Sequence, residues 1–200
     1  MLESGGKKAG YAIALERAWD ELVIDNLPAS TEISSHSDDS ISLIYFGRKY
    51  HIDLANRSIR TENGSESPEI RKILILHYLL GATHARIRNH EVGFAQIPGA
   101  EGYLRPFSGR VIFPLTGMFD REPKKTATAF ATMGAEMLDF ATWCCKVWAF
   151  ALVPLRIIYW RGDDEIASGG QIVFDAGIGE IFAVEDVAVL CEDMMRLLRE

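Results

Sequence analysis

Length, composition and charge already exclude several classes of protein. The chain has 200 residues, of which 48% are hydrophobic and 24% charged, and this is the composition of an ordinary globular domain. The net charge of −7 and the scattered Lys and Arg residues argue against a nucleic-acid partner or an acidic membrane, because phosphate groups are bound by a basic surface. We expect a single α+β domain over residues 10–200, after a flexible N-terminus over residues 1–9.

The sequence predicts a soluble, cytoplasmic protein. Residues 1–8 lack the apolar core of a secretory signal peptide. The most apolar stretch, residues 137–160, contains no uncharged run of about 18 residues, which a membrane-spanning helix requires. It is interrupted by Asp139, Lys146, Pro154 and Arg156.

The three cysteines, Cys144, Cys145 and Cys191, show no disulfide or metal pattern. Their number is odd, two are adjacent, and none has the spacing of a zinc or iron–sulfur motif. Each lies in an apolar segment, which predicts buried, free thiols. The sequence also contains no nucleotide-binding, α/β-hydrolase or metalloprotease motif.

The first third of the chain predicts one helix followed by three strands. Apolar residues recur at helical spacing, then a Ser- and Asp-rich loop leads into apolar runs with β propensity. Gly47 can take a positive φ angle and therefore marks a hairpin connection. The expected elements are a helix over 11–25, a loop over 29–40, strands over 41–46 and 50–54, and a short third strand over 58–60.

The clearest helix begins after Ser67 and Pro68. Ser67 can cap its N-terminus, and Pro68 suits a first-turn position where the backbone N–H has no partner. Gly81 is expected to end the helix. The helix is apolar almost all round, so we expect it to be central and His77 to point into the core. One stripe of the helix contains Ile70, Ile73, Leu74, His77 and Gly81.

The middle of the chain gives a weaker pattern. A short strand is expected over 92–96, and one or two helices over 125–133 and 136–150. Residues 102–107 and 113–119 are rich in aromatic side chains and show no clear period. The last helix is expected over 185–198, with acidic residues at its start, where the helix dipole favours them.

Residues 153–175 predict a pair of antiparallel strands around an acidic connection. The first strand is expected over 153–160 and the second over 171–174, and Asp163, Asp164 and Glu165 lie between them. In this arrangement Asp175 lies at the far end of the second strand, about 15 Å from the other acids, so one cation cannot join them. We expect Asp175 to hold a turn or to cap a backbone N–H. Together with the strands at 41–60, this pair predicts a mostly antiparallel sheet packed by several helices.

Several short motifs occur in an order that resembles a known family. The chain resembles a family of uncharacterised proteins from anaerobic bacteria and archaea, a domain of unknown function of about this length. The resemblance rests on 76–79, Gly99 to Tyr103 with Phe107, 153–155, 160–165, 174–175 and the last helix. Some members of the family that the chain resembles look fused to a cysteine-rich iron–sulfur segment. This chain lacks those cysteines. The chain also has Ile166, Ala167 and Ser168 where the family has Phe-Pro-Ala, and its glycines before Tyr103 are separated.

Three groups of residues are candidates for chemistry. The acids Asp163, Asp164 and Glu165 are of the kind that binds Mg²⁺ or Ca²⁺, but they match no EF-hand loop, and acidic turns are usually only solvated, so no metal site is assigned. His77, with Tyr78 beside it, is a candidate general base, although a buried His with one hydrogen-bond partner gives the same pattern. The candidates for binding a flat ligand are Tyr103, Phe107 and Trp160, although aromatic residues in a core give this pattern too.

Three functions are compatible with these observations. The first is a non-catalytic accessory or ligand-binding module, which the resemblance would link to anaerobic metabolism. The second is a small enzyme that uses His77 with the acidic turn. The third is a subunit that docks a protein partner or self-associates. The identity of a cofactor, ligand or protein partner does not follow from the sequence.

Overall fold

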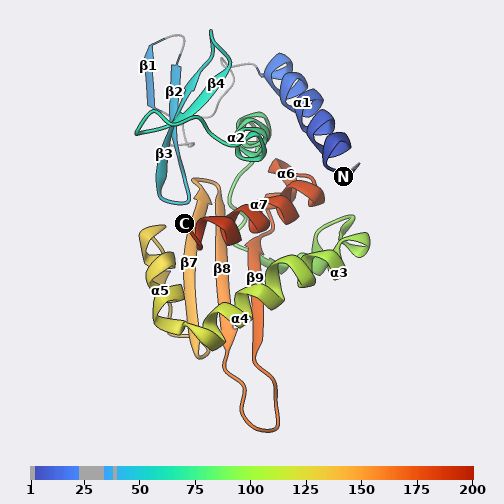
Figure 1. The fold of residues 1–200 in the computed structure, drawn as a ribbon, viewed down its shortest axis with the longest axis vertical. Helices are drawn as coiled ribbons and strands as arrows, with labels where there is room; N and C mark the ends of the chain where they lie inside the picture. The colour runs from blue at the N-terminus through green and yellow to red at the C-terminus, as the bar shows by residue number, and fades with distance from the viewer. Residues whose placement is uncertain (1–2, 23–33, 38–39) are drawn as a thin grey trace.

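The computed structural model describes residues 3–22, 34–37 and 40–200, and two antiparallel sheets with packed helices make up this part of the chain (Figure 1). This confirms the predicted α+β class. The elements are α1 (Glu3–Glu21), β1 (Ser34–Ser37), β2 (Ser40–Tyr45), β3 (Arg48–Asp53), β4 (Ser58–Thr61), α2 (Glu69–Gly81), β5 (Glu91–Gly93), η2 (Phe94–Gln96), η3 (Ala100–Gly102), α3 (Leu104–Phe107), the π-helix η4 (Ser108–Ile112), α4 (Phe113–Arg121), α5 (Pro123–Thr132), β6 (Glu136–Met137), β7 (Trp143–Phe150), β8 (Val153–Trp160), β9 (Gly169–Asp175), α6 (Ile178–Ile181) and α7 (Val184–Leu197). Among the described residues, none of the helices combines the length and apolar character needed to span a membrane.

The N-terminal sheet has the strand order β1-β2-β3-β4. The sequence predicted its three later strands. The connection between β2 and β3 was expected over residues 47–49, but the turn begins one residue earlier. Tyr45 pairs with Arg48, so Phe46 and Gly47 form a two-residue turn with φ angles of 45° and 73°. Strand β1 lies in the segment predicted as loop, and residues 29–33 and 38–39 of that segment lie outside the described residues.

The C-terminal sheet has the order β5-β9-β8-β7-β6 and is separate from the first, whereas the sequence predicted one sheet. The helix expected over 136–150 was wrong. This segment forms β6 and β7, and Cys144 and Cys145 therefore lie on a strand, where adjacent side chains point to opposite faces. All three cysteines are free and buried, as predicted.

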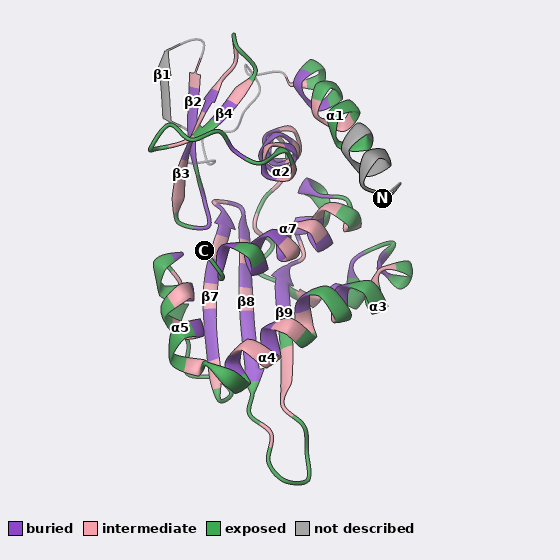
Figure 2. Ribbon diagram, in the orientation of Figure 1, coloured by how far each residue is buried: buried purple, intermediate pink, exposed green. Residues whose placement is uncertain are grey.

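Helices α4, α5 and α7 cover one face of the C-terminal sheet (Figure 1). The Phe119 ring contacts the rings of Trp143 and Tyr159, with centroids 4.5 and 5.0 Å apart. Figure 2 shows how β7, β8 and β9 are buried along most of their length, while the loop between β8 and β9 is exposed. The strands of this sheet therefore have a helix-covered face and an opposite face, which we call the outer face.

The two sheets meet where the β2–β3 turn reaches the end of β7. The Phe46 N–H donates to the Ala149 carbonyl at 3.1 Å. The Phe150 ring lies 4.8 Å from the Tyr45 ring and stacks on the Tyr78 ring of α2 at 4.1 Å. The hydrophobic core is consequently continuous between the sheets.

Helix α1 begins at Glu3, within the segment expected to be flexible, and packs against α2 (Figure 1). The helix ends at Glu21, whereas the sequence predicted that it continues to Asp25. Residue 22 is not helical, and residues 23–25 lie outside the described residues. At the start of α2, the predicted cap is also wrong. Ser67 makes no side-chain cap, and its buried Oγ has no hydrogen-bond partner within the described ranges.

A buried ion pair joins α2, α7 and the N-terminal sheet. The Arg71 Nε donates to Asp193 Oδ2 at 2.8 Å, and both side chains are almost fully buried. The Tyr45 hydroxyl donates to the same carboxylate at 2.9 Å, and Arg71 Nη1 donates to the Tyr50 hydroxyl at 3.0 Å. Burial alone would lower the pKa of Arg71, but the hydrogen bond and charge of Asp193 outweigh it and raise that pKa.

We predict that Asp193→Ala lowers the free energy of unfolding by about 3–5 kcal/mol, because it leaves the buried Arg71 with only the half-exposed Glu200, 3.6 Å away, as a counter-charge. Urea denaturation measures the change. Replacing both residues, Arg71→Met with Asp193→Leu, is expected to cost less than the single change, since no charge is then stranded. A smaller loss for Asp193→Ala than for the double replacement would contradict the role given to this pair.

Gly81 is the last residue of α2 and is required for a reason different from the predicted helix stop. The helix cap is Ala82, and Gly81 does not have a positive φ angle. A Cβ atom at Gly81 would lie 2.3 Å from the Ile181 carbonyl oxygen of α6. The absence of a side chain therefore permits the close approach of α2 and α6.

We predict that Gly81→Ala destabilises the protein by about 1–3 kcal/mol, although Ala has the higher helix propensity. The matched control is Gly10→Ala in α1, where a Cβ would meet nothing within 4 Å. The control should be neutral or stabilising. Thermal unfolding of the two variants separates the packing effect from helix propensity. An equal change in stability in both variants would show that α6 moves to accommodate the added Cβ.

Candidate functional site

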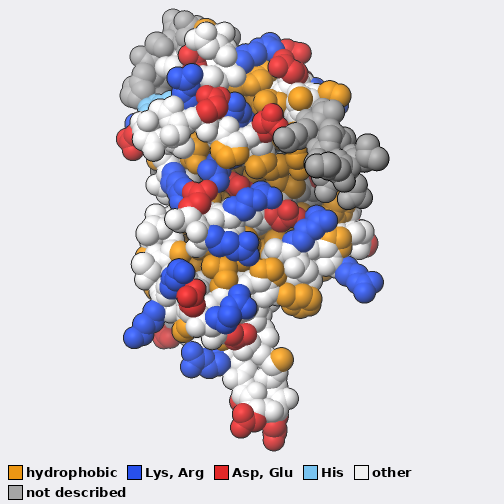
Figure 3. Space-filling model, viewed as in Figure 1, with side chains coloured by type: hydrophobic (Ala, Val, Ile, Leu, Met, Phe, Trp, Pro, Cys, Tyr) orange, Lys and Arg blue, Asp and Glu red, His pale blue; other side chains and the backbone are white. Residues whose placement is uncertain are grey.

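The β8–β9 hairpin has the predicted arrangement. Trp160 pairs with Gly169 at one end, and Leu155 pairs with Phe174 near the other. The acids Asp163, Asp164 and Glu165 lie in an exposed loop that projects from the molecule, and Figure 3 shows acidic side chains at its tip. Asp175 lies at the opposite end of β9, as the sequence predicted.

At each end of the β8–β9 hairpin, an Asp side chain accepts backbone N–H groups. Asp163 Oδ1 accepts the N–H of Glu165 at 2.9 Å and that of Ile166 at 2.8 Å, and these bonds hold the pKa of Asp163 below its usual range. Asp175 Oδ1 accepts the N–H of Arg88 at 2.8 Å and that of Gly177 at 2.9 Å. The expected turn-holding role of Asp175 is therefore confirmed.

His77 does not point into the core as expected. Its side chain is 30% exposed and faces α7, where Nδ1 lies 2.9 Å from Asp186 Oδ2. The burial of Ile73 and Leu74 on the same helix is confirmed. Helix α2 and the acidic loop lie toward opposite ends of the molecule (Figure 1), so the structure does not bring His77 and the acids together.

The aromatic candidates also lie in different places. The Tyr103 hydroxyl donates to Glu185 at the start of α7, and this bond raises the pKa of Tyr103. Phe107 is buried and stacks on Phe94 at 3.9 Å, beside a cavity of about 210 Å³. Trp160 is partly exposed at the end of β8, and Tyr78 is buried against Phe150. Within the described ranges, no three His, Cys, Asp or Glu side chains are arranged to hold a metal ion.

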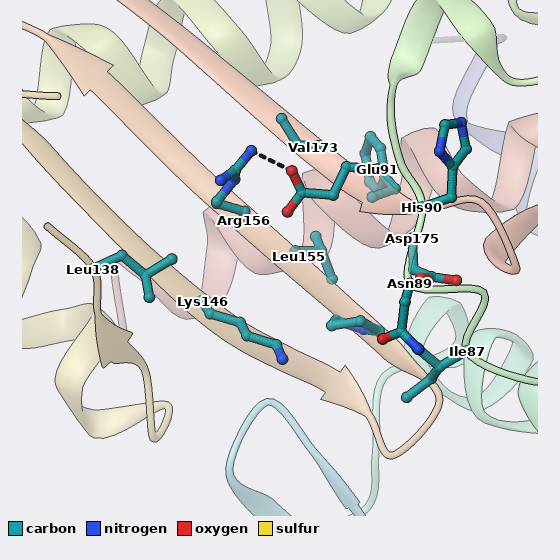
Figure 4. Close-up of a pocket in the computed structure, with 12 residues that line it drawn as sticks. Ile87, Asn89, His90, Glu91, Leu138, Lys146, Leu155, Arg156, Val173 and Asp175 are labelled. Carbon is teal, nitrogen blue, oxygen red and sulfur yellow. Dashed lines mark hydrogen bonds and ion pairs between the residues drawn. The ribbon is translucent and has the colours of Figure 1, made fainter. Parts of the chain in front are cut away.

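A larger cavity of about 430 Å³ lies on the outer face, and we call it the sheet cavity (Figure 4). Strands β7, β8 and β9 form its floor, and the segment over residues 87–91 forms one wall. Its size falls in the range of small-molecule pockets. It is lined by Ile87, Asn89, His90, Glu91, Leu138, Lys146, Pro154, Leu155, Arg156, Val173, Phe174 and Asp175.

The strand register brings the charged residues of the sheet cavity together. Lys146 pairs with Arg156 across β7 and β8, and Glu91 pairs with Asp175 across β5 and β9. Figure 4 shows Arg156 pointing to Glu91, with which it forms an ion pair. Asp175 is already engaged by the two backbone N–H groups.

Lys146 forms no ion pair with any described residue, although it lies opposite Glu136 in the pairing of β6 and β7. Its Nζ lies 4.2 Å from the centre of the Trp148 ring and forms no ion pair there. The neighbouring Arg156 also keeps a buried Nε that donates to none of the described residues. Leu138, Pro154 and Val173 supply apolar surface beside these donors. The arrangement can therefore hold a small molecule that combines an apolar body with an anionic group.

Sequence reasoning missed Lys146, Arg156 and Glu91. The signal was present, because Lys146 and Arg156 interrupt apolar runs that otherwise read as buried. On a strand, such an isolated charge marks the face that is not packed against the core. Recognising it required β7 to be assigned as a strand.

The fold and the cavity define an α+β protein with a ligand-sized cavity on the outer face of an antiparallel sheet. The family model described as "Domain of unknown function (DUF3786)" matches residues 24–197, so the chain belongs to this family. This confirms the resemblance to a domain of unknown function. No curated protein and no solved structure matches the chain.

We predict that Asp175→Ala lowers the free energy of unfolding by about 1–3 kcal/mol, because two backbone N–H groups lose their buried acceptor. Amide hydrogen exchange at Arg88 and Gly177 should become faster. The matched control is Asp163→Ala, which removes the same kind of acceptor from an exposed loop, where water replaces it. If the two variants lose similar stability, the wall of the sheet cavity does not depend on Asp175.

Proposed function

We propose that this protein is a non-catalytic module that binds a small organic anion in the sheet cavity. The observation that carries the proposal is Lys146, which lines a cavity of about 430 Å³ and forms no ion pair within the described part of the chain. A cation beside apolar walls favours a ligand with a carboxylate or similar group on an apolar body. A role in anaerobic metabolism, which the resemblance implies, and the cytoplasmic location that the sequence predicts belong to this proposal.

The neighbouring charges support an anion over a cation. Glu91 is neutralised by Arg156, and the Asp175 carboxylate accepts two backbone N–H groups. A cationic ligand would have to displace one of these contacts and would also meet Lys146. An anionic ligand can form an ion pair with Lys146 without breaking either contact.

A second proposal is catalysis through His77, which is favoured by its contact with Asp186 at 2.9 Å. A carboxylate that orients an imidazole is a common feature of general bases. The acidic turn cannot serve with it, because the two lie toward opposite ends of the molecule. His77 does not line the sheet cavity, so this function would be independent of Lys146.

We predict that the protein binds 2-naphthoate more tightly than the neutral 2-naphthamide, because only the carboxylate can pair with Lys146. Lys146→Gln should weaken 2-naphthoate binding by about tenfold or more, which is the loss of one charge-assisted hydrogen bond. Titration calorimetry measures the affinities, and backbone amide shifts in β7 and β8 locate the site. A native mass spectrum of the purified protein identifies any ligand that it retains.

The matched control is Lys124→Gln, which makes the same change of charge at an exposed position of α5 and should leave binding unchanged. Equal binding of the carboxylate and the amide would contradict the proposed recognition. An equal effect of the two lysine replacements would show that Lys146 acts only through net charge.

A further inference from the structure

Exposed apolar side chains gather at the end of the C-terminal sheet from which the β8–β9 loop projects. Met137 and Ile166 are 61% and 69% exposed, and Phe140 is 49% exposed. Trp160 is also exposed, and its ring meets Phe140 edge-on with centroids 6.4 Å apart. Large apolar side chains that stay exposed together are typical of a protein interaction surface.

The two segments that carry these side chains are fixed to each other. The Arg161 N–H donates to Thr142 Oγ1 at 3.0 Å, which joins the projecting loop to the turn before β7. Within the loop, the Gly162 N–H donates to Ser168 Oγ at 2.9 Å. A Cβ at Gly162 would lie 2.3 Å from the Ile166 carbonyl oxygen, so the loop is closed tightly on itself. A surface ordered in advance loses less entropy when a partner binds.

Five acidic residues belong to the same two segments as these apolar side chains. All are exposed, and none forms an ion pair with another described residue. The nearby Arg156 is paired with Glu91, Lys146 lies opposite Glu136 in the pairing of β6 and β7, and Arg161 is the cation of the loop itself. The acids are Glu136, Asp139, Asp163, Asp164 and Glu165.

We propose that this acidic end patch, formed by Met137, Phe140, Trp160, Ile166 and the five acids, docks a protein that presents apolar side chains among Lys and Arg residues. The charge complementarity selects this partner. In a symmetric contact with a second copy, the five acids of one chain would face those of the other. A nucleic acid would meet the same negative charge with its phosphates.

The apolar and acidic residues have different parts in this interaction. The rings of Phe140 and Trp160 supply buried area, which sets how long the partner remains bound. The acids steer the basic partner toward the patch and make association weaker at high salt. The proposal therefore requires both a loss of affinity on removing Phe140 and a loss of salt dependence on removing the acids.

The test uses the full chain and a fluorescein-labelled amphipathic peptide of Leu and Lys, with a Leu and Glu peptide as its counterpart. Fluorescence anisotropy should show binding of the Lys peptide and none of the Glu peptide. Phe140→Ser, and separately Asp164→Asn with Glu165→Gln, should each weaken binding by about tenfold. The acid replacement should also flatten the dependence of affinity on salt.

Each variant has a matched control. Phe113→Ser removes an even more exposed ring from α4, and Glu62→Gln with Glu101→Gln removes two exposed acids elsewhere. These controls should change affinity by less than about twofold. Loss of affinity in the controls equal to that in the patch variants would overturn the proposal. So would binding of the Glu peptide, failure of the Lys peptide to bind, or a dimer in sedimentation velocity that Phe140→Ser dissociates.

Discussion

The buried pair of Arg71 and Asp193 fixes how the two halves of this protein are joined. Arg71 belongs to α2, which packs with the N-terminal sheet, and Asp193 belongs to α7, which covers the C-terminal sheet. The hydroxyls of Tyr45 and Tyr50 complete the hydrogen bonds of the pair. Apolar contacts alone would allow α7 to slide along α2. The buried charges of Arg71 and Asp193 prevent this, because each would lose its hydrogen-bond partners if α7 moved. The position of α7, and with it the helix-covered face of the C-terminal sheet, follows from this constraint.

The sequence predicted the elements whose pattern is local. Helices α2 and α7, the strands β2, β3 and β4, and the β8–β9 hairpin follow from periodicity and turn residues, and the role of Asp175 follows from strand geometry. The prediction for residues 136–150 failed because β7 carries buried apolar side chains on both faces, with Lys146 as the one charge among them. Val147 packs under the helices, and Cys144 packs with Ile158 and Val173 on the outer face. Such a run has the composition of a buried helix, and its period does not decide between the two.

How the residues of the candidate site come together could not be predicted from the sequence, for a different reason. Lys146, Arg156 and Glu91 become neighbours through the order β5-β9-β8-β7, which places the earliest strand at the edge beside the last. This order is a tertiary property, and a shift of one residue in register would turn Lys146 into the core. The sequence instead favoured His77 and the acidic turn, because conspicuous residue types are visible in a sequence and spatial neighbours are not. Gly81 shows the same limit, since the backbone that excludes its Cβ belongs to α6.

Arg156 is the residue at which the two proposed surfaces meet. Its guanidinium pairs with Glu91 in the sheet cavity and lies 5.4 Å from the centre of the Phe140 ring in the acidic end patch. A partner that covers Phe140 would hold the Arg156 guanidinium in place, and with it the Arg156–Glu91 pair beside which an anion would bind Lys146. Any coupling between the two binding events is reciprocal in free energy, so each ligand would change the affinity of the other by the same factor. Because β7 and β8 are paired along their length, rotation of the Arg156 side chain is the simplest route for that coupling.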